Sequence, residues 1–166
     1  MKLILCRHGL AVEREDYITK DIDDSLRPLV EKGRTRSKEA AKFLREHIEN
    51  IDLIVSSPFV RAMQTAEILQ NILQSSEIVE SIELVPSAPP QAFAQWLHHH
   101  AKTALTIAAV GHEPQLSVFA TWCLSGGTNS FVDLKKSGMI CLEVESFEEL
   151  GPKSANLKWV VQPKLF

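Results

Sequence analysis

Two arginines and two histidines directly follow predicted buried strands, and together they suit phosphoryl transfer. Ligands of open α/β sheets bind outside the carboxyl ends of the strands, so we expect these four side chains to meet at one edge of a sheet. An arginine fork binds paired phosphate oxygens and stays charged. A histidine can attack phosphorus, and a second histidine can supply a proton or a hydrogen bond. The positions are Arg7 and His8 after residues 2–6, Arg61 after residues 52–56, and His112 after residues 104–110.

The turns that follow the second and third of these strands are typical of helix starts. Ser57 and Pro58 give a serine N-cap and a proline at the first helical position. We expect Glu113, beside Pro114, to cap the other helix. The free N–H groups of both helix starts would point at the same anion. Because the arginines compensate the charge of that anion, this chemistry requires no metal ion and no cofactor.

Each of these residues taken alone has an ordinary structural interpretation. An arginine after a strand is usually a solvated charge, so Arg61 alone would indicate half of an exposed ion pair. His112 alone would indicate a turn residue. Their joint position at three strand ends favours a shared site instead.

The elements that must position these residues alternate between strand and helix. Short apolar runs predict buried strands, and apolar residues at helical spacing among charges predict amphipathic helices. We expect an α/β fold, a three-layer α/β/α sandwich with a mostly parallel central sheet, in which the last two strands form an antiparallel hairpin. Strands are predicted at 2–6, 52–56, 82–85, 104–110, 139–145 and 157–162, helices at 31–49, 58–73, 91–100 and from about 114 to 124, and a loop with a turn of helix at 9–30.

Length and composition predict a single domain over residues 1–166. The chain is 45% hydrophobic and 23% charged, which is typical of a globular domain. A net charge of −3 disfavours a nucleic-acid partner, and no apolar stretch approaches the ~20 residues of a membrane span. The three cysteines are an odd number without CxxC spacing, so we expect a protein of the reducing cytoplasm.

Four segments resemble the motifs of the histidine phosphatase superfamily, and within it the chain is similar to the SixA-type phosphohistidine phosphatases. The order of the segments matches that family from residue 1 to at least residue 125. The segments are RHG at 7–9, SLRPLVEKGRTRS at 25–37, SSPFVRAMQTA at 56–66 and VGHEP at 110–114.

The resemblance implies a phosphoglycerate-mutase-like fold and a metal-independent phosphatase. It implies that His8 is the phosphorylated nucleophile and that Arg7, Arg61 and His112 complete the phosphate pocket. Larger members of the family carry an acidic residue after the second motif. Glu83 lies roughly at that place, where it is equally well explained as a solvated residue of an edge strand, and Asp24 is a weaker candidate for the acid.

Three functions remain open at this stage. The first is removal of phosphate from phosphohistidine in a partner protein, and the second is hydrolysis of a small phosphate ester. The third is a non-catalytic module that grips a phosphorylated protein. The chain has no evident lid insertion, which disfavours mutase activity and favours an open site.

Two further patterns carry no chemistry. Cys6 lacks the arginine that a cysteine phosphatase requires six positions later, because residue 12 is Val12. Adjacent histidines of a helix point in different directions, so residues 98–100 cannot converge on one metal ion.

Overall fold

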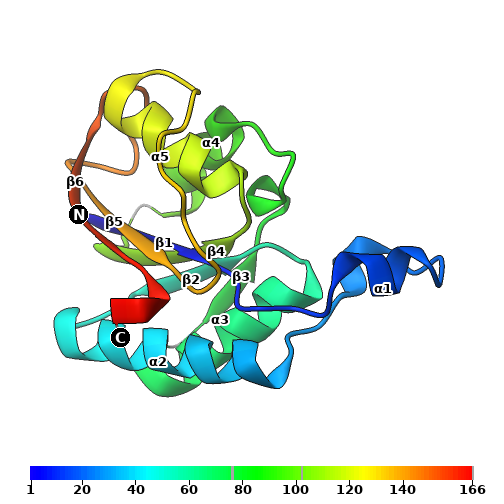
Figure 1. Ribbon diagram of the computed structural model, residues 1–166. Coiled ribbons are helices and arrows are strands. Elements are labelled where there is room, and N and C mark those ends of the chain that lie inside the picture. The colour runs from blue at the N-terminus through cyan, green and yellow to red at the C-terminus, as the bar shows by residue number, and fades with distance from the viewer. Residues whose placement is uncertain (76, 102, 166) are drawn as a thin grey trace.

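A six-stranded sheet in the order β3-β2-β4-β1-β5-β6 forms the centre of the computed structural model (Figure 1). The structure describes residues 1–75, 77–101 and 103–165. The four strands β1 to β4 run parallel, β5 is antiparallel to β1, and β6 is antiparallel to β5. The strands are β1 (Lys2–Arg7), β2 (Leu53–Ser56), β3 (Ile78–Glu80), β4 (Thr106–Gly111), β5 (Met139–Val144) and β6 (Ala155–Val161).

Helices cover both faces of the sheet, which confirms the predicted three-layer α/β/α fold. In Figure 1, α2 and α3 lie below the sheet and α4 and α5 lie above it. The short helix α1 projects to one side as part of an arm between β1 and α2. The helices are α1 (Arg14–Ile18), α2 (Glu31–His47), α3 (Val60–Leu73), α4 (Pro90–His100) and α5 (Gln115–Ser125), with 3-10 turns at Asp24–Leu26, Ile82–Leu84 and Pro163–Leu165.

The central strands are apolar on both faces because each face meets helices. Leu3 and Leu5 of β1 belong to the core under α4 and α5, where Phe119 is fully buried. Ile4 and Cys6 belong to the second core, against α2 and α3. Successive side chains along a strand therefore pack alternately into the two cores, as is usual for a sheet buried on both sides.

The strand predicted at residues 82–85 is wrong. The edge strand is β3, which begins four residues earlier and pairs with β2 through Ile78 and Val79. Residues Ile82–Leu84 form a 3-10 turn instead, because the Ser81 hydroxyl accepts the Glu83 N–H at 3.3 Å and starts the turn.

The predicted capping of the helix after β2 is also wrong. Helix α3 begins at Val60, and Phe59 rather than Ser57 is its N-cap residue. The Ser57 hydroxyl lies 2.9 Å from His112 Nε2 and accepts the Phe59 N–H at 3.4 Å, so this side chain links the segment before α3 to the strand-end region. The hairpin predicted for the last two strands is confirmed by the antiparallel pairing of β5 and β6. No helix in the described part of the chain is long and apolar enough to cross a membrane.

Candidate active site

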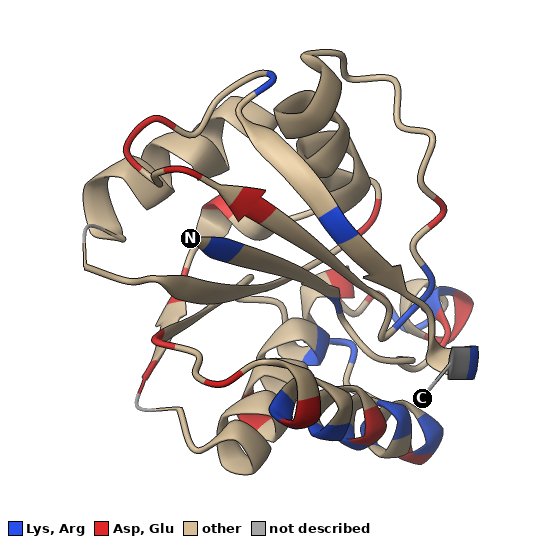
Figure 2. Cartoon of the chain, turned by 90° about the vertical axis from the view of Figure 1, so that its left-hand side faces the viewer, with Lys and Arg blue, Asp and Glu red and all other residues tan. Residues whose placement is uncertain are grey.

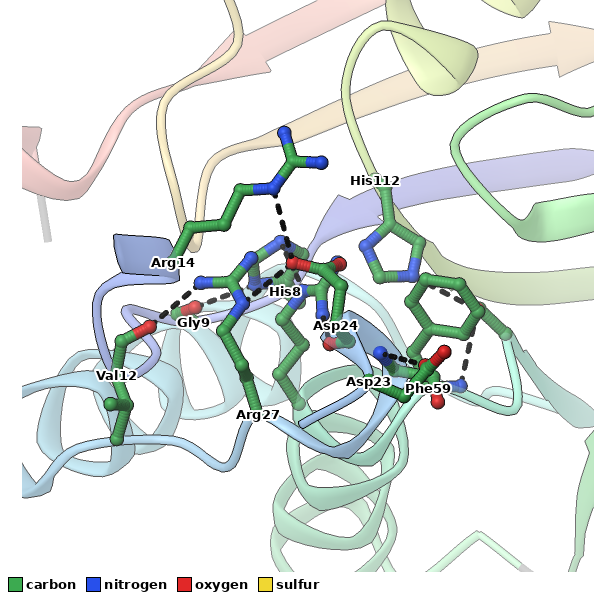
Figure 3. Close-up of polar contacts among 12 residues, drawn as sticks. His8, Gly9, Val12, Arg14, Asp23, Asp24, Arg27, Phe59 and His112 are labelled. Carbon is green, nitrogen blue, oxygen red and sulfur yellow. Dashed lines mark hydrogen bonds and ion pairs between the residues drawn. The ribbon is translucent and has the colours of Figure 1, made fainter. Parts of the chain in front are cut away.

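The carboxyl ends of β1 and β4 lie side by side and bring the two histidines together. β1 pairs in parallel with β4, with Arg7 opposite Gly111, and the His8 N–H donates to the Gly111 carbonyl at 3.0 Å. The ring centroids of His8 and His112 are consequently only 4.9 Å apart. Figure 3 shows His8 and His112 in one group of side chains with Asp24 and Arg27. The predicted convergence at the sheet edge therefore rests on strand register.

His8 presents an unprotonated Nε2 atom. The side chain is 5% exposed, and its Nδ1 lies 2.7 Å from the Gly9 carbonyl. A carbonyl only accepts hydrogen bonds, so Nδ1 carries the proton of the neutral ring. Nε2 accepts from Arg61 Nε at 3.3 Å. Burial, and then the neighbouring His112, hold the pKa of His8 well below its ordinary value, so the ring stays neutral. A neutral imidazole whose Nε2 is unprotonated is the form that can attack phosphorus, once the long hydrogen bond from Arg61 yields to the phosphoryl group.

Arg61 is fixed beside His8 Nε2. The side chain is 3% exposed and lies over the Phe59 ring, with its guanidinium carbon 5.0 Å from the ring centroid. Nη1 donates to the Asp24 carbonyl at 2.7 Å, and Nη2 donates to the Asp24 carboxylate at 2.9 Å. These contacts hold a planar fork of donors next to His8, where the oxygens of a transferring phosphoryl group would lie.

His112 has one ring nitrogen in use and one free. Nε2 lies 2.9 Å from the Ser57 hydroxyl, and the ring packs edge-on against Phe59 at 5.0 Å between centroids. Nδ1 is buried and has no hydrogen-bond partner among the described residues. Burial lowers the pKa of His112 to about 3, with Arg61 and Arg7 acting in the same direction. A buried polar atom without a partner is costly, and a ligand oxygen would satisfy it.

We expect His112 to make the fold acid-sensitive. The folded pKa of about 3 lies below the ordinary 6.5, so in between the unfolded chain binds a proton that the folded chain does not. The free energy of unfolding therefore falls as the pH drops through this window. At about pH 5 this one histidine accounts for a loss of roughly 2 kcal/mol.

Urea unfolding of the wild type and of His112→Asn at neutral pH and at about pH 5 measures this effect. The variant should lose less stability on acidification than the wild type. His99→Asn, which removes an exposed histidine on α4, should keep the wild-type dependence. Parallel pH profiles for the wild type and His112→Asn would contradict the assignment.

The loop after β1 is held firmly between α2 and α3. The Gly9 N–H donates to the Thr65 hydroxyl at 3.1 Å, and that hydroxyl donates to the Arg61 carbonyl at 2.8 Å. On the other side the loop lies directly against α2. A side chain at Gly33 would come within 2.0 Å of the Leu10 carbonyl, so only glycine permits this approach. The loop that carries His8 is thus fixed from two sides.

Arg7 closes the site on the side of β5. Its Nη1 donates to the Leu134 carbonyl at 2.6 Å, while its Nε is buried and without a partner among the described residues. Backbone bonds from Ser137 to the Arg7 and His8 carbonyls, at 3.2 and 3.1 Å, tie the loop before β5 to the end of β1. Arg7 therefore keeps donor capacity for an anion.

Asp24, on the arm that carries α1, links three arginines. Its carboxylate accepts from Arg61 at 2.9 Å and from Arg27 Nε at 2.8 Å, and it lies 3.7 Å from Arg14 Nε (Figure 3). Partial burial alone would raise its pKa, but the hydrogen bond from Arg27 and the charge of Arg61 outweigh burial and hold the pKa below its ordinary value. A carboxylate that stays ionised is poorly suited to donate a proton, so Asp24 is better described as a partner of Arg61.

This arm makes the site more covered than the sequence predicts. His8, Arg61 and His112 are all at most 5% exposed. The interpretation of an open sheet edge therefore needs correction, because residues 9–30 bring Asp24 onto the guanidinium of Arg61.

The backbone of Glu83, the candidate acid, contacts the start of α5. Its carbonyl accepts from Gln115 Nε2 at 3.2 Å, at the start of α5. The next residue, Leu84, lies against the end of β4, because its carbonyl oxygen would be 3.2 Å from a Cβ atom placed on Gly111. The Glu83 side chain is half-buried, and its carboxylate makes no hydrogen bond or ion pair within the described ranges of the chain. Its role as an acid stays a prediction.

Other residues that could have carried chemistry have structural roles. Glu113 caps α5 as expected, because its carboxylate accepts the Ser117 N–H at 3.2 Å. Cys6 is buried, and burial raises the pKa of its thiol to about 12, so it is not a thiolate nucleophile. His98 contacts the Glu148 carbonyl at 2.6 Å.

Sequence reasoning missed several polar residues that hold the site. Ser57 and Thr65 both lie in the 56–66 segment, and Arg27 lies in the 25–37 segment. Their place in these motif-like segments is the sequence feature that could have indicated a role at the site. Nothing in the sequence pairs Asp24 with Arg61, because that contact depends on how the arm folds back.

Comparison with known proteins identifies related chains. Residues 3–85 match the histidine phosphatase superfamily (branch 1). An uncharacterized protein of Picosynechococcus sp. is 36% identical over 143 residues, which is 86% of this chain and 84% of that protein.

Solved structures share the fold at lower identity. The protein histidine phosphatase SixA complexed with tungstate has a TM-score of 0.84 and 22% identity, covering 99% of this chain and 98% of that one. A mycobacterial glucosyl-3-phosphoglycerate phosphatase has a TM-score of 0.70 and 17% identity, covering 95% of this chain and 97% of that one.

Proposed function

Since this chain belongs to the histidine phosphatase superfamily (branch 1), we propose that it removes phosphate from phosphohistidine in a partner protein through a phosphohistidine at His8. The observation that carries the proposal is the unprotonated Nε2 of His8, held at 3.3 Å from Arg61 and beside His112. No metal ion or cofactor enters the reaction.

In the first step, Nε2 of His8 attacks phosphorus. A new N–P bond forms as the P–N bond to the substrate imidazole breaks, and the leaving imidazole takes a proton from water. Arg61 and Arg7 bind the phosphoryl oxygens, and His112 offers its free Nδ1 to one of them. In the second step water attacks phosphorus, the His8 N–P bond breaks, and inorganic phosphate leaves while His8 returns to its neutral form.

The leaving group supports phosphohistidine over an alcohol ester. Imidazole leaves readily once protonated, so its departure asks little of a dedicated acid. No carboxylate in the described part of the chain forms a hydrogen bond or an ion pair with His8 or His112. The likeness in fold to SixA with bound tungstate, a phosphate-like oxyanion, agrees with this proposal.

A small phosphate ester is the second candidate substrate. The fold likeness to a phosphatase of glucosyl-3-phosphoglycerate favours it, as does Glu83 next to the start of α5. The alcohol of a phosphate ester leaves as an alkoxide unless its oxygen is protonated. Ester hydrolysis therefore needs an acid, which Glu83 would supply.

The test compares kcat/KM for a phosphohistidine protein with kcat/KM for a panel of sugar phosphates, phosphoserine and nucleotides. We expect the phosphohistidine protein to be turned over at least about tenfold more efficiently. A preference of that size for an ester would overturn the proposed substrate. Tight binding of the phosphoprotein without phosphate release would indicate a binding module instead.

Glu83→Gln tests the role of the acid separately. If Glu83 protonates leaving groups, the variant should slow ester hydrolysis by about 10²-fold or more and slow P–N cleavage much less. Glu80→Gln on the neighbouring edge strand is the matched control and should change neither rate. Equal rates for Glu83→Gln and wild type on both substrates would assign Glu83 to the solvated surface.

A further inference from the structure

A cationic pocket of about 590 Å³ adjoins the site and shares Arg7 with it. Its remaining charged lining residues are Arg36, Lys135, Lys136 and Lys164, and among the described residues no carboxylate lines it. The other lining residues, Leu10, Gln162 and Pro163, are uncharged. In a chain of net charge −3, this concentration of cations is a local feature. Figure 2 shows Lys and Arg segments gathered on α2 and near the C-terminal end of the chain.

Hydrogen bonds hold the pocket in shape. The Lys135 N–H donates to Gln162 Oε1 at 3.0 Å, and Gln162 Nε2 donates to the Asp133 carbonyl at 2.9 Å. The loop before β5 is thereby tied to the segment after β6. A Cβ at Gly138 would stand 2.7 Å from the Gln162 oxygen, so a side chain there would disrupt this junction. The cations therefore project from a fixed frame.

Most of these cations lack an anionic partner. Lys135 pairs with Asp133, but Arg36, Lys136 and Lys164 form no ion pair or hydrogen bond within the described residues. Lys136 is half-buried, and burial lowers the pKa of its ammonium group, with Arg7 adding to the effect and Glu13 opposing it. An anion that entered the pocket would relieve this unfavourable clustering.

We infer that this pocket binds carboxylates flanking the phosphohistidine of the partner protein. The inference rests on the proposed function and adds a specificity site to it. The cations come from β1, α2, the loop before β5 and the C-terminal turn, so they line the pocket from several elements and can meet more than one carboxylate. Several carboxylates on one protein surface match this spread, and Arg7 places them next to the phosphoryl group. Such complementarity selects partners and speeds association.

Two synthetic phosphohistidine peptides, one flanked by glutamates and one by glutamines, provide the test. We expect the wild type to favour the acidic peptide by about tenfold in kcat/KM and to lose that preference in high salt. The double variant Arg36→Gln/Lys164→Gln, and separately Lys136→Gln, should reduce the preference to about threefold or less. The ratio of the two rates does not depend on the folded fraction of a variant, so instability cannot mimic this result.

Lys42→Gln is the matched control, because Lys42 is exposed on α2 outside the pocket and carries the same charge. It should keep the wild-type preference. Equal turnover of both peptides by the wild type would overturn the pocket assignment and leave the proposed function standing. Turnover of neither peptide, with efficient hydrolysis of a small ester, would overturn both.

Discussion

We expect His8→Ala to abolish measurable turnover and to leave the fold intact. Loss of a covalent nucleophile costs up to ~10⁶-fold in kcat, and we expect a loss of at least about 10³-fold here. The ring sits at the end of β1, outside both apolar cores, and within the described residues it hydrogen-bonds only to Gly9 and Arg61. Rapid quenching with ³²P-labelled substrate should trap acid-labile, base-stable label on the wild type and none on the variant.

The control for this experiment is His99→Ala, which removes an exposed histidine from α4. It should retain both turnover and label. An unchanged circular dichroism spectrum for His8→Ala would show that the lost activity comes from lost chemistry. Label of the same stability on His8→Ala would move the nucleophile to another histidine, with His112 the first to examine.

The sequence predicts that His8 and His112 lie together, because strand ends determine their positions. His8 and His112 are separated by about a hundred residues along the chain, yet each directly follows a buried strand. Parallel pairing of β1 with β4 then leaves little freedom in where the two rings lie. The layers are predictable for the same reason, since apolar runs on both faces require helices on both sides.

The parts that escape prediction are set by tertiary contacts. A short apolar run such as residues 82–85 fits a strand and a 3-10 turn equally well, and the Ser81 hydroxyl decides between them. Ser57 is a residue type that is common at helix N-caps, but its hydroxyl lies beside His112 Nε2. The arm has no strong periodicity, so its fold, and with it the contact of Asp24 with Arg61, cannot be read from local sequence.

The arm orients the arginine that we assign to the phosphoryl group. Asp24 binds the same guanidinium that we assign to the phosphoryl oxygens, through Nη1 and Nη2 of Arg61. Nε donates to His8, and Nη1 and Nη2 each keep a second N–H that these contacts do not use. An incoming phosphoryl group therefore meets an arginine already oriented by a carboxylate. That orientation lowers the entropy lost on binding, which makes Arg61 a strong contributor to the transition state.

We accordingly expect Arg61→Ala to lower kcat/KM by about 10²- to 10³-fold, the ~3–4 kcal/mol typical of a lost oxyanion donor. Arg61→Lys keeps the charge but loses the fork, so it should recover only a small part of the loss. The fold should survive because Asp24, freed from Arg61, is partly exposed and keeps Arg27 as its partner. Steady-state kinetics on the phosphohistidine protein and the affinity for tungstate give the two measurements.

The two measurements separate binding from catalysis. A loss in kcat/KM much larger than the loss in tungstate affinity means that Arg61 acts on the charge that develops during transfer. Equal losses mean that it binds ground state and transition state alike. Near-normal kcat/KM in Arg61→Ala would instead mean that Arg61 serves Asp24 and the arm. The charge compensation would then rest on Arg7 and on Arg27, which Asp24 already holds at 2.8 Å.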